Sequence, residues 1–448
     1  MNNESGRNKL VVVLGAGPAG LYAAKQLGEH GVEVVLLNRD VKPGGLAEYG
    51  IYYDKYKMKA GLRKQFSKIL KSDKINYFGN VTIGEGKDLT FPEIKSMGFQ
   101  AIMVAVGAQG TKWLGLPGED LKGVYHAKDI VYHYNKLPPF SQQEFLIGKR
   151  VALIGVGNVM VDIAHWLIRD LKVDEVIAVA RRGPAEIKFT KHEFQYIANN
   201  LDLQSLDEEI DRVRERMLAV NQDPEKAKTF IRSALPKALD AVSETRFRFA
   251  FLSSPKQILG DEQGRVTGLE VENTKLVPKN GDTKAKRLGT TRVLDVDTVV
   301  FCIGDKVDSS FGLPVEWNEF VKNPNPRYPI NGVSYEAYDP GAKKPIDGVF
   351  MAGWSREASS GLVGVARKDG ESGALAVLNY LETLPPIDGL EDKLEAIIQR
   401  IKALPHPVVD KEAIWRLEEL ERAIAEKQGV EFFKFGSNEE MLKAIGMI

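Results

Sequence analysis

Residues 10–20 read LVVVLGAGPAG, an unbroken apolar run followed by a glycine-rich turn. The five apolar residues at its start predict a strand that is buried on both faces, as in a parallel sheet. A helical pattern follows as far as about Glu29, and residues 32–37 predict a second strand. The stretch therefore indicates a strand–helix–strand unit, the building block of α/β folds with a parallel sheet.

The turn of this unit has the glycine spacing G-x-G-x-x-G. Gly15 permits the tight turn, Gly17 lets the backbone approach a pyrophosphate, and Gly20 allows the helix to pack closely on the strand. The N-terminus of the helix faces the phosphates. We expect these glycines, with Pro18 and Ala19, to bind a dinucleotide; the alternative is a glycine turn with a purely structural role.

One residue departs from this motif. Asn38 ends the second strand, where an acidic residue usually accepts hydrogen bonds from a ribose. An amide can still accept from one hydroxyl, but it lacks the charge of a carboxylate. We therefore expect weaker adenosine binding at this position, not its loss.

The same pattern returns after a predicted strand at residues 151–154. Gly155 and Gly157 match the motif, whereas Met160 occupies the third small-residue position. The chain thus contains two nucleotide-binding-type units. In the second, Met160 must turn aside or the helix must lie further from the strand.

Arg181 and Arg182 follow the next predicted strand of this second unit. Two guanidinium groups at that strand end are placed to bind a 2′-phosphate bidentately. The pair therefore favours NADP(H) over NAD(H); a solvated arginine pair is the alternative.

Two similar apolar strands with glycine endings, at residues 101–108 and 299–304, bracket the second unit. We interpret them as the two crossings of a domain boundary. The predicted fold is α/β with two Rossmann-like dinucleotide-binding domains, one inserted into the other. Residues 1–109 and 306–448 form the first domain, the latter with C-terminal helices, and residues 110–305 form the inserted domain.

Composition excludes several classes of protein. The 448 residues contain 61 Lys plus Arg, 61 Asp plus Glu and a single cysteine, Cys302. One cysteine cannot form a disulfide, a redox-active cysteine pair or a cysteine-held cluster within this chain. A net charge of zero argues against nucleic-acid binding. No apolar run is long enough to span a bilayer, and Met1 to Asn8 shows no signal segment. We expect a cytoplasmic protein.

At this point the motifs resemble, in order and along nearly the whole chain, the adrenodoxin reductase family of FAD-containing ferredoxin–NADP⁺ reductases. The motifs are the two glycine turns, a GGL…YG loop at residues 43–50, the segment 78–81, the Arg181–Arg182 pair, and the closing segment 352–364. The resemblance implies FAD contacts at Gly15, Gly17, Pro18, Ala19, Gly20, Asn38, Gly45, Leu46, Val81, Gly353, Trp354, Gly361, Leu362 and Val363. It implies NADP contacts at Val156, Gly157, Asn158, Val159, Arg181, Arg182 and Glu193.

The resemblance also implies a mechanism in which electrons pass from NADPH through FAD to an iron–sulfur protein. Asp162 and Glu193 are the candidate catalytic residues, near the nicotinamide; surface carboxylates are the alternative. No metal ligand is expected. Three departures from the family, Asn38, Lys55 and Met160, bear on cofactor affinity and on a proton route near the flavin.

The expected partner is a ferredoxin-like protein or a larger redox enzyme. Ferredoxins are acidic, so their docking site should be basic. The candidate patch has acidic residues interleaved, which favours a solvated helix face instead. It consists of Arg212, Arg214, Arg216, Lys226, Lys228 and Arg232. Three alternatives stay open: an electron-transfer subunit like the related glutamate synthase small subunit, a binding or assembly flavoprotein with little turnover, and a diaphorase.

Overall fold

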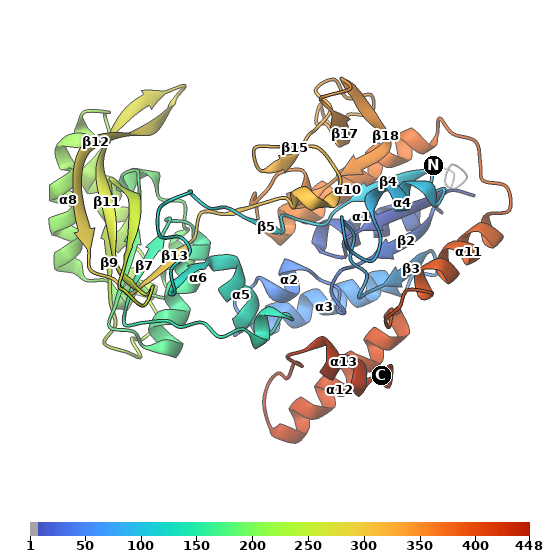
Figure 1. The fold of residues 1–448 in the computed structure, drawn as a ribbon, viewed down its shortest axis with the longest axis horizontal. Coiled ribbons are helices and arrows are strands. Elements are labelled where there is room, and N and C mark those ends of the chain that lie inside the picture. The colour runs from blue at the N-terminus through green and yellow to red at the C-terminus, as the bar shows by residue number, and fades with distance from the viewer. Residues whose placement is uncertain (1–7) are drawn as a thin grey trace. The chain divides into compact units, whose positions relative to one another are not determined.

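The computed structural model describes residues 8–448, so nearly all of the polar N-terminal segment, residues 1–7, lies outside the described residues. The chain forms two compact units, each built on a sheet of mainly parallel strands (Figure 1). Unit 1 contains the described residues up to Thr111, together with Tyr132–Gln142 and Gly304–Ile448. Unit 2 contains Lys112–Val131 and Gln143–Ile303. The sequence did not indicate the return of residues 132–142 to unit 1.

Unit 1 is organised around a six-stranded sheet with the order β17-β18-β4-β1-β2-β3. Only the β17–β18 pair is antiparallel among its neighbours. The strands are β1 (Leu10–Leu14), β2 (Glu33–Leu37), β3 (Ile75–Phe78), β4 (Ala101–Val104), β17 (Glu336–Asp339) and β18 (Lys344–Met351). Two short pairs accompany them, β5 (Gly110–Thr111) with β14 (Asp305–Lys306) and β15 (Val315–Glu316) with β16 (Glu319–Phe320).

The helices of unit 1 cover both faces of this sheet. Helix α1 packs along α10 on one face, as Figure 1 shows. The helices are α1 (Pro18–Glu29), α2 (Leu46–Tyr49), α3 (Tyr56–Leu70), α4 (Phe91–Ser96), α10 (Val363–Leu381), α11 (Leu390–Lys402), α12 (Lys411–Gln428) and α13 (Asn438–Ala444). Helix α5 (Ala127–Tyr134) carries the chain from unit 2 back into unit 1.

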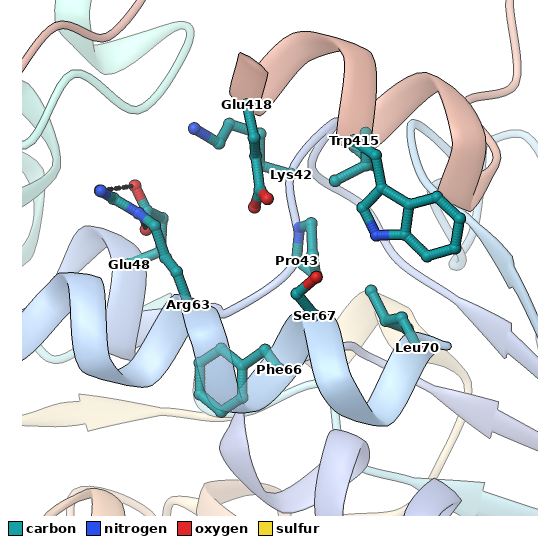
Figure 2. Close-up of a pocket in the computed structure, with 10 residues that line it drawn as sticks. Lys42, Pro43, Glu48, Arg63, Phe66, Ser67, Leu70, Trp415 and Glu418 are labelled. Atoms are coloured by element: carbon teal, nitrogen blue, oxygen red, sulfur yellow. Dashed lines mark hydrogen bonds and ion pairs between the residues drawn. The ribbon is translucent and has the colours of Figure 1, made fainter. Parts of the chain in front are cut away.

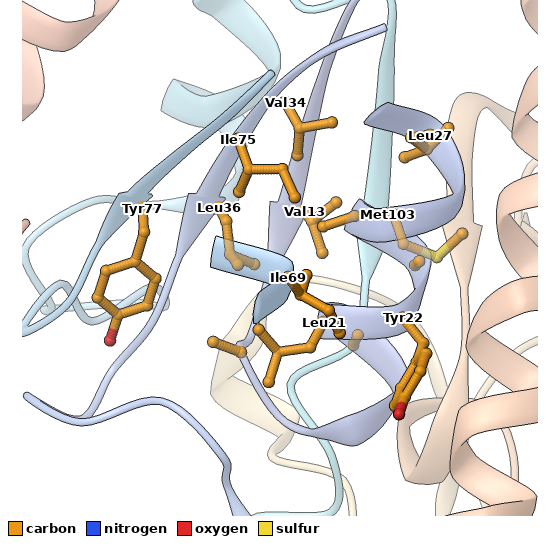
Figure 3. Packing of buried hydrophobic residues seen from close by; sticks show 14 of the residues in the cluster. Val13, Leu21, Tyr22, Leu27, Val34, Leu36, Ile69, Ile75, Tyr77 and Met103 are labelled. Carbon is orange, nitrogen blue, oxygen red and sulfur yellow. The ribbon is translucent and has the colours of Figure 1, made fainter. Parts of the chain in front are cut away.

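Every residue of β1 is fully buried, which confirms a strand covered on both faces. Because successive side chains point to opposite faces, Val11 and Val13 join one core cluster, whereas Leu10, Val12 and Leu14 join another. Figure 3 shows Val13 in the first cluster, among residues of α1, α3 and the neighbouring strands. The apolar run at residues 10–14 therefore lies at the centre of the core of unit 1.

Unit 2 has a five-stranded parallel sheet with the order β6-β13-β7-β8-β9. Its strands are β6 (Val124–His126), β7 (Arg150–Ile154), β8 (Glu175–Val179), β9 (Arg246–Ala250) and β13 (Thr298–Phe301). A three-stranded antiparallel sheet of β10 (Ser253–Gly260), β11 (Val266–Lys279) and β12 (Asp282–Leu294) packs on it through a shared apolar cluster. Strands β11 and β12 form an antiparallel hairpin.

Helix α6 (Asn158–Trp166) follows strand β7 and continues into a π-helical turn, Leu167–Leu171. Helices α7 (Lys191–Phe194), α8 (Leu203–Leu218) and α9 (Pro224–Arg232) follow strand β8. The described residues contain no helix of the length and apolarity needed to cross a membrane.

Candidate nucleotide-binding sites

The first glycine turn is formed as the motif predicts. Gly15 follows β1 with a φ of +101°, a left-handed conformation that residues with a side chain rarely adopt. A Cβ at Gly15 would lie 2.4 Å from the carbonyl oxygen of Ala105, and one at Gly20 only 1.8 Å from that of Gly15. Both distances are far below van der Waals contact, so only glycine lets α1 begin this close to the sheet.

The N-terminus of α1 is open toward a ligand. Its N-cap is Gly17, and no side chain in the described part of the chain caps it; the first turn also lacks an acidic residue. By contrast, Asp202 caps α8 and Asp410 caps α12. Gly45 approaches from the next loop so closely that a Cβ there would lie 3.0 Å from Cα of Gly17. Uncapped amides and the helix dipole together suit a phosphate group.

Asn38 has a structural task next to this turn. Its Oδ1 accepts a hydrogen bond from the Ala16 amide at 3.0 Å. Its Nδ2 donates to the carbonyl oxygens of Asp40 at 2.8 Å and Lys42 at 3.0 Å. A carboxylate could not make these two donations. Asn38 therefore ties the glycine turn to the following loop, and both of its amide hydrogens are used for that purpose.

The loop that ends at Gly45, where α2 begins with Leu46, leads into a buried cluster of charged side chains. Figure 2 shows Lys42, Glu48 and Arg63 around a narrow pocket that is closed by α12. Glu48 accepts from Arg63 Nε at 2.6 Å and lies 2.5 Å from Lys434 Nζ, and Lys42 pairs with Glu421. Residues far apart in the sequence thus hold this loop, and no motif indicated them.

Burial and pairing act against each other in this cluster. Burial alone would raise the pKa of Glu48, but Lys434, Lys42 and Arg63 hold it far below its usual range. Burial lowers the pKa of Lys434 to about 8, against the opposing effect of Glu48. Burial also lowers the pKa of Lys59, which donates to Asn135, to about 7. Buried ion pairs therefore fix the loop. Removing one partner of such a pair leaves the other charge buried and unpaired, which is strongly destabilising.

The closing segment is fixed by α10. Asp369 accepts from the Gly353 amide at 2.6 Å and from Arg356 Nη2 at 2.6 Å. The indole Nε1 of Trp354 donates to the carbonyl oxygen of Ser360 at 2.8 Å. These bonds fold residues 353–361 back on themselves at the start of α10, whose N-terminus has no side-chain cap from any described residue. The roles of Asp369 and Arg356 had no signal in the sequence.

The second glycine turn repeats the first in its geometry. Gly155 has a φ of +125°, and a Cβ there would lie 2.4 Å from the carbonyl oxygen of Cys302. Met160, at the third position, is fully buried in the core. Gly157 is the N-cap of α6, and the structure shows no capping side chain on it from the described residues. The turn thus keeps its shape and its open helix terminus despite Met160.

Two hydrogen bonds hold the segment just before Glu193 beside this turn. The carbonyl oxygen of Val156 accepts from the Lys188 amide at 2.9 Å. Oδ1 of Asn158 accepts from the Thr190 amide at 2.9 Å, and Thr190 caps the short helix that carries Glu193. Asp162 lies half-buried one turn along α6, and Val159 is 42% exposed.

The two arginines differ in their surroundings. Arg181 is exposed, whereas Arg182 donates to both carboxylate oxygens of Asp282 and to the carbonyl oxygen of Thr283. Both stand directly after β8, beside the strand that carries the glycine turn. This is the placement on which the 2′-phosphate prediction rests.

Most of the basic patch predicted on α8 and α9 is neutralised within these two helices. Arg212 pairs with Glu209, and Arg214 pairs with Asp211 and Glu225. Lys228 and Arg232 share Asp207. This arrangement favours the solvated helix face over a docking patch for an acidic protein.

Cys302 lies buried at the end of β13, and burial raises the pKa of its thiol well above the usual range. A thiol of this kind is inert. The described residues contain no group of three or more His, Cys, Asp or Glu that could hold a metal ion.

Each unit has a sheet of mainly parallel strands, a glycine turn and an uncapped helix behind that turn. This arrangement is typical of a protein that binds two dinucleotides. The chain belongs to the pyridine nucleotide-disulphide oxidoreductase family, which matches residues 9–334. It is 28% identical to the NADPH-ferredoxin reductase FprA of Mycobacterium leprae, over 97% of each chain. It is 27% identical to the mitochondrial NADPH:adrenodoxin oxidoreductase of Arabidopsis thaliana, over 81% of this chain and 80% of that protein.

The fold is also similar to that of solved structures. The structure of Mycobacterium tuberculosis FprA in complex with NADPH matches with a TM-score of 0.79 and 26% identity. The match covers 98% of this chain and all of that one. The predicted α/β fold with two Rossmann-like units is thereby confirmed.

Proposed function

We propose that the protein is an FAD-dependent oxidoreductase that takes electrons from NADPH and passes them to a ferredoxin-like iron–sulfur protein. The observation that carries this function is the pair of open glycine turns, one in each unit, of which only the second is followed by two arginines. Relatives named as NADPH-ferredoxin and NADPH:adrenodoxin reductases align with most of the chain and support the same electron path.

FAD fits unit 1. Its pyrophosphate would meet the open N-terminus of α1 at Gly17, with Pro18, Ala19 and Gly20 in the first turn. The narrow gap between Gly17 and Gly45 leaves backbone, not side chains, facing the phosphates. Val81 is 1% exposed and its amide donates to the carbonyl oxygen of Asn38 at 2.9 Å, so this residue would support the adenine side from below the surface. The remaining contacts fall on Leu46, Gly353, Trp354, Gly361, Leu362 and Val363.

The loop before α10 suits a flat aromatic ring. Leu362 is 72% exposed and directly precedes the uncapped N-terminus of that helix. Covering an apolar side chain of this size with a ring removes apolar area from water, which is favourable. Asp369 holds Gly353 and Arg356 behind the loop and so positions it.

NADPH fits unit 2. The Gly155–Gly157 turn and the open end of α6 would take the pyrophosphate, with Val156, Asn158 and Val159 alongside. Arg181 and Arg182 would bind the 2′-phosphate. Asp162 and Glu193 are our candidates for orienting the nicotinamide end. Asn158 supports Glu193 indirectly, because it fixes Thr190 at the start of the same short helix.

Bound FAD would supply the redox chemistry, because a flavin can accept two electrons together from NADPH and release them one at a time. The protein's own residues bind and position the two cofactors. Although the family is named for disulphide chemistry, the one cysteine of this chain cannot form an internal redox pair and is buried. Electrons therefore leave for another molecule. One buried thiol also fits a reducing compartment, for which we propose the cytoplasm.

Spectroscopy of the purified protein tests this function. The protein should be yellow, and anaerobic NADPH should bleach its visible absorption at much lower concentration than NADH. Cytochrome c reduction should then depend on added ferredoxin. A colourless protein, or one that NADPH does not bleach, contradicts the proposal. Equal cytochrome c reduction with and without ferredoxin would make it a diaphorase.

A further inference from the structure

Unit 2 contains a pocket of its own, apart from the one in Figure 2, formed by residues of α8 and of the β11–β12 hairpin. Its volume is about 340 Å³. None of its lining residues belongs to a glycine turn or to the Arg181–Arg182 pair. The lining residues are Arg212, Arg216, Asn273, Leu288, Thr290 and Arg292.

The three arginines of this pocket carry more positive charge than their neighbours neutralise. Arg212 forms two hydrogen bonds with Glu209. Arg216 donates to the carbonyl oxygens of Thr274 and Arg212, and Arg292 donates to the hydroxyl of Ser253. Neutral partners satisfy hydrogen bonds but carry no charge, although Glu209 also acts electrostatically on Arg216 and Arg292. Three guanidinium groups therefore share the negative charge of one carboxylate, which leaves a net positive charge.

The acidic side chain next to the pocket on β11 is engaged elsewhere. Glu272 precedes Asn273 on β11, at a point where the pairing of β11 with β12 is irregular. Glu272 accepts from the Gly289 amide at 2.8 Å and lies 3.7 Å from Arg287. Glu272 therefore does not supply the missing negative charge.

Two buried polar atoms of the pocket residues have no partner among the described residues, Nε of Arg292 and Oδ1 of Asn273. A buried donor without a partner is costly and is rare in folded proteins. Burial and the nearby guanidinium of Arg212 lower the pKa values of Arg216 and Arg292, against the opposing effect of Glu209. An arginine nevertheless stays charged in proteins, so a bound oxyanion would offset the charge that Glu209 leaves unbalanced.

We propose that this pocket is a binding site for a small oxyanion, a phosphate or carboxylate group of a metabolite, held by the guanidinium forks of Arg216 and Arg292. Arg212 and the hydroxyl of Thr290 lie alongside, and Leu288 adds an apolar wall. A planar guanidinium matches either group bidentately. The site is separate from the one proposed for the 2′-phosphate and stands independently of the proposed function.

Calorimetry with the intact protein tests the site. The protein is first saturated with NADP⁺, so that the nucleotide site is filled, and is then titrated with inorganic phosphate or with succinate at constant ionic strength. We expect at least one of the two probes to bind. Arg216→Gln and Arg292→Gln should each weaken that binding at least tenfold. The matched control is Arg214→Gln on the same helix, because Arg214 is not among the lining residues and pairs with Asp211 and Glu225; it should leave binding unchanged.

The two probes distinguish the sources of the oxyanion, since a preference for phosphate indicates a phosphorylated ligand and a preference for succinate a carboxylate ligand. The proposal is overturned if neither probe binds. It is also overturned if Arg216→Gln, Arg292→Gln and Arg214→Gln all bind the probe equally well. Abolition of phosphate binding by NADP⁺ would also overturn it, because the anion would then belong to the nucleotide site. If Arg292→Gln fails to fold, Arg216→Lys replaces it: this variant keeps the charge but lacks the fork, and unweakened binding to it contradicts the assignment.

Discussion

Nη1 of Arg182 lies 3.2 Å from both carboxylate oxygens of Asp282, which is 100 residues further along the chain. Asp282 opens β12 at the tip of the β11–β12 hairpin, and its side chain is 72% exposed, compared with 23% for Arg182. A hairpin carboxylate therefore occupies one of the two guanidinium groups proposed for the 2′-phosphate. An ion pair this exposed contributes little and can be displaced.

This pair predicts a variant with improved NADPH binding. Asp282→Asn removes the competing charge from Arg182, so the KM for NADPH should fall, roughly two- to fivefold, while that for NADH stays unchanged. Asp295→Asn is the matched control, because Asp295 is also 72% exposed and pairs with another arginine, Arg150. Steady-state kinetics with both nucleotides measure the effect. Equal changes in the two KM values would show that Asp282 does not act on the 2′-phosphate.

Removal of the arginines should have the opposite effect. Arg181→Ala and Arg182→Ala should each raise the KM for NADPH by about 10- to 100-fold, the range of a lost charge-assisted hydrogen bond. The KM for NADH should change little, because NADH has no 2′-phosphate. Arg246→Ala, at the start of β9, is the control and should affect neither nucleotide. Similar losses with both nucleotides would refute the assignment of the pair.

The close packing of α1 predicts that Gly20→Ala is destabilising. Its Cβ would lie 1.8 Å from the carbonyl oxygen of Gly15, so the helix must move away from the sheet. We expect a loss of about 1–3 kcal/mol in the free energy of unfolding, typical of overpacking, and weaker retention of FAD. Gly61→Ala is the control, because no atom lies within 4 Å of its added Cβ in α3. That change should stabilise the helix by up to about 1 kcal/mol; a thermal melt in which both variants behave alike would contradict the packing argument.

The lowered pKa of Lys59 predicts a pH dependence of stability. Burial lowers this pKa from 10.5 to about 7. Between these two values the unfolded chain binds more protons than the folded chain, so Lys59 makes the free energy of unfolding rise with pH across this window. Urea unfolding of wild type and Lys59→Met should therefore diverge from about pH 7 upward, with wild type gaining. The exposed neighbour Lys57 supplies the control variant Lys57→Met, whose profile should run parallel to that of wild type; a parallel profile for Lys59→Met would contradict the prediction.

The closing segment depends on one carboxylate. Asp369→Asn leaves the 8% exposed guanidinium of Arg356 with only the exposed carboxylate of Glu357 as an ion-pair partner, and it weakens the bond to the Gly353 amide. Breaking a buried pair costs about 3–5 kcal/mol, so unfolding should require less denaturant and FAD should dissociate more readily. Glu371→Gln, two residues later in α10, breaks only the exposed pair with Arg367 and is the control. Retention of FAD as in wild type would show that Asp369 does not position this segment.

Local pattern was sufficient for the parts of the molecule that depend on neighbours in sequence. The apolar run at residues 10–14 and the glycines behind it predicted β1, the turn and α1, because a buried strand and a close helix start require these residue types in any surroundings. The repeat at Gly155 predicted the second turn in the same way, although Met160 stands at the third position.

Tertiary structure decided how the predicted residues are used. Asn38 was predicted at the ribose on the basis of its position, yet its amide hydrogens bind the carbonyl oxygens of Asp40 and Lys42. The partners of Glu48 and Asp369, and the pairing of Arg182 with Asp282, have no local signal. Such contacts join segments up to 386 residues apart in the case of Glu48 and Lys434. The sequence by itself thus determined two nucleotide turns on parallel sheets, because backbone sterics act locally. Only the folded chain decided which charges meet, because a side chain's partner is set by the packing of distant segments.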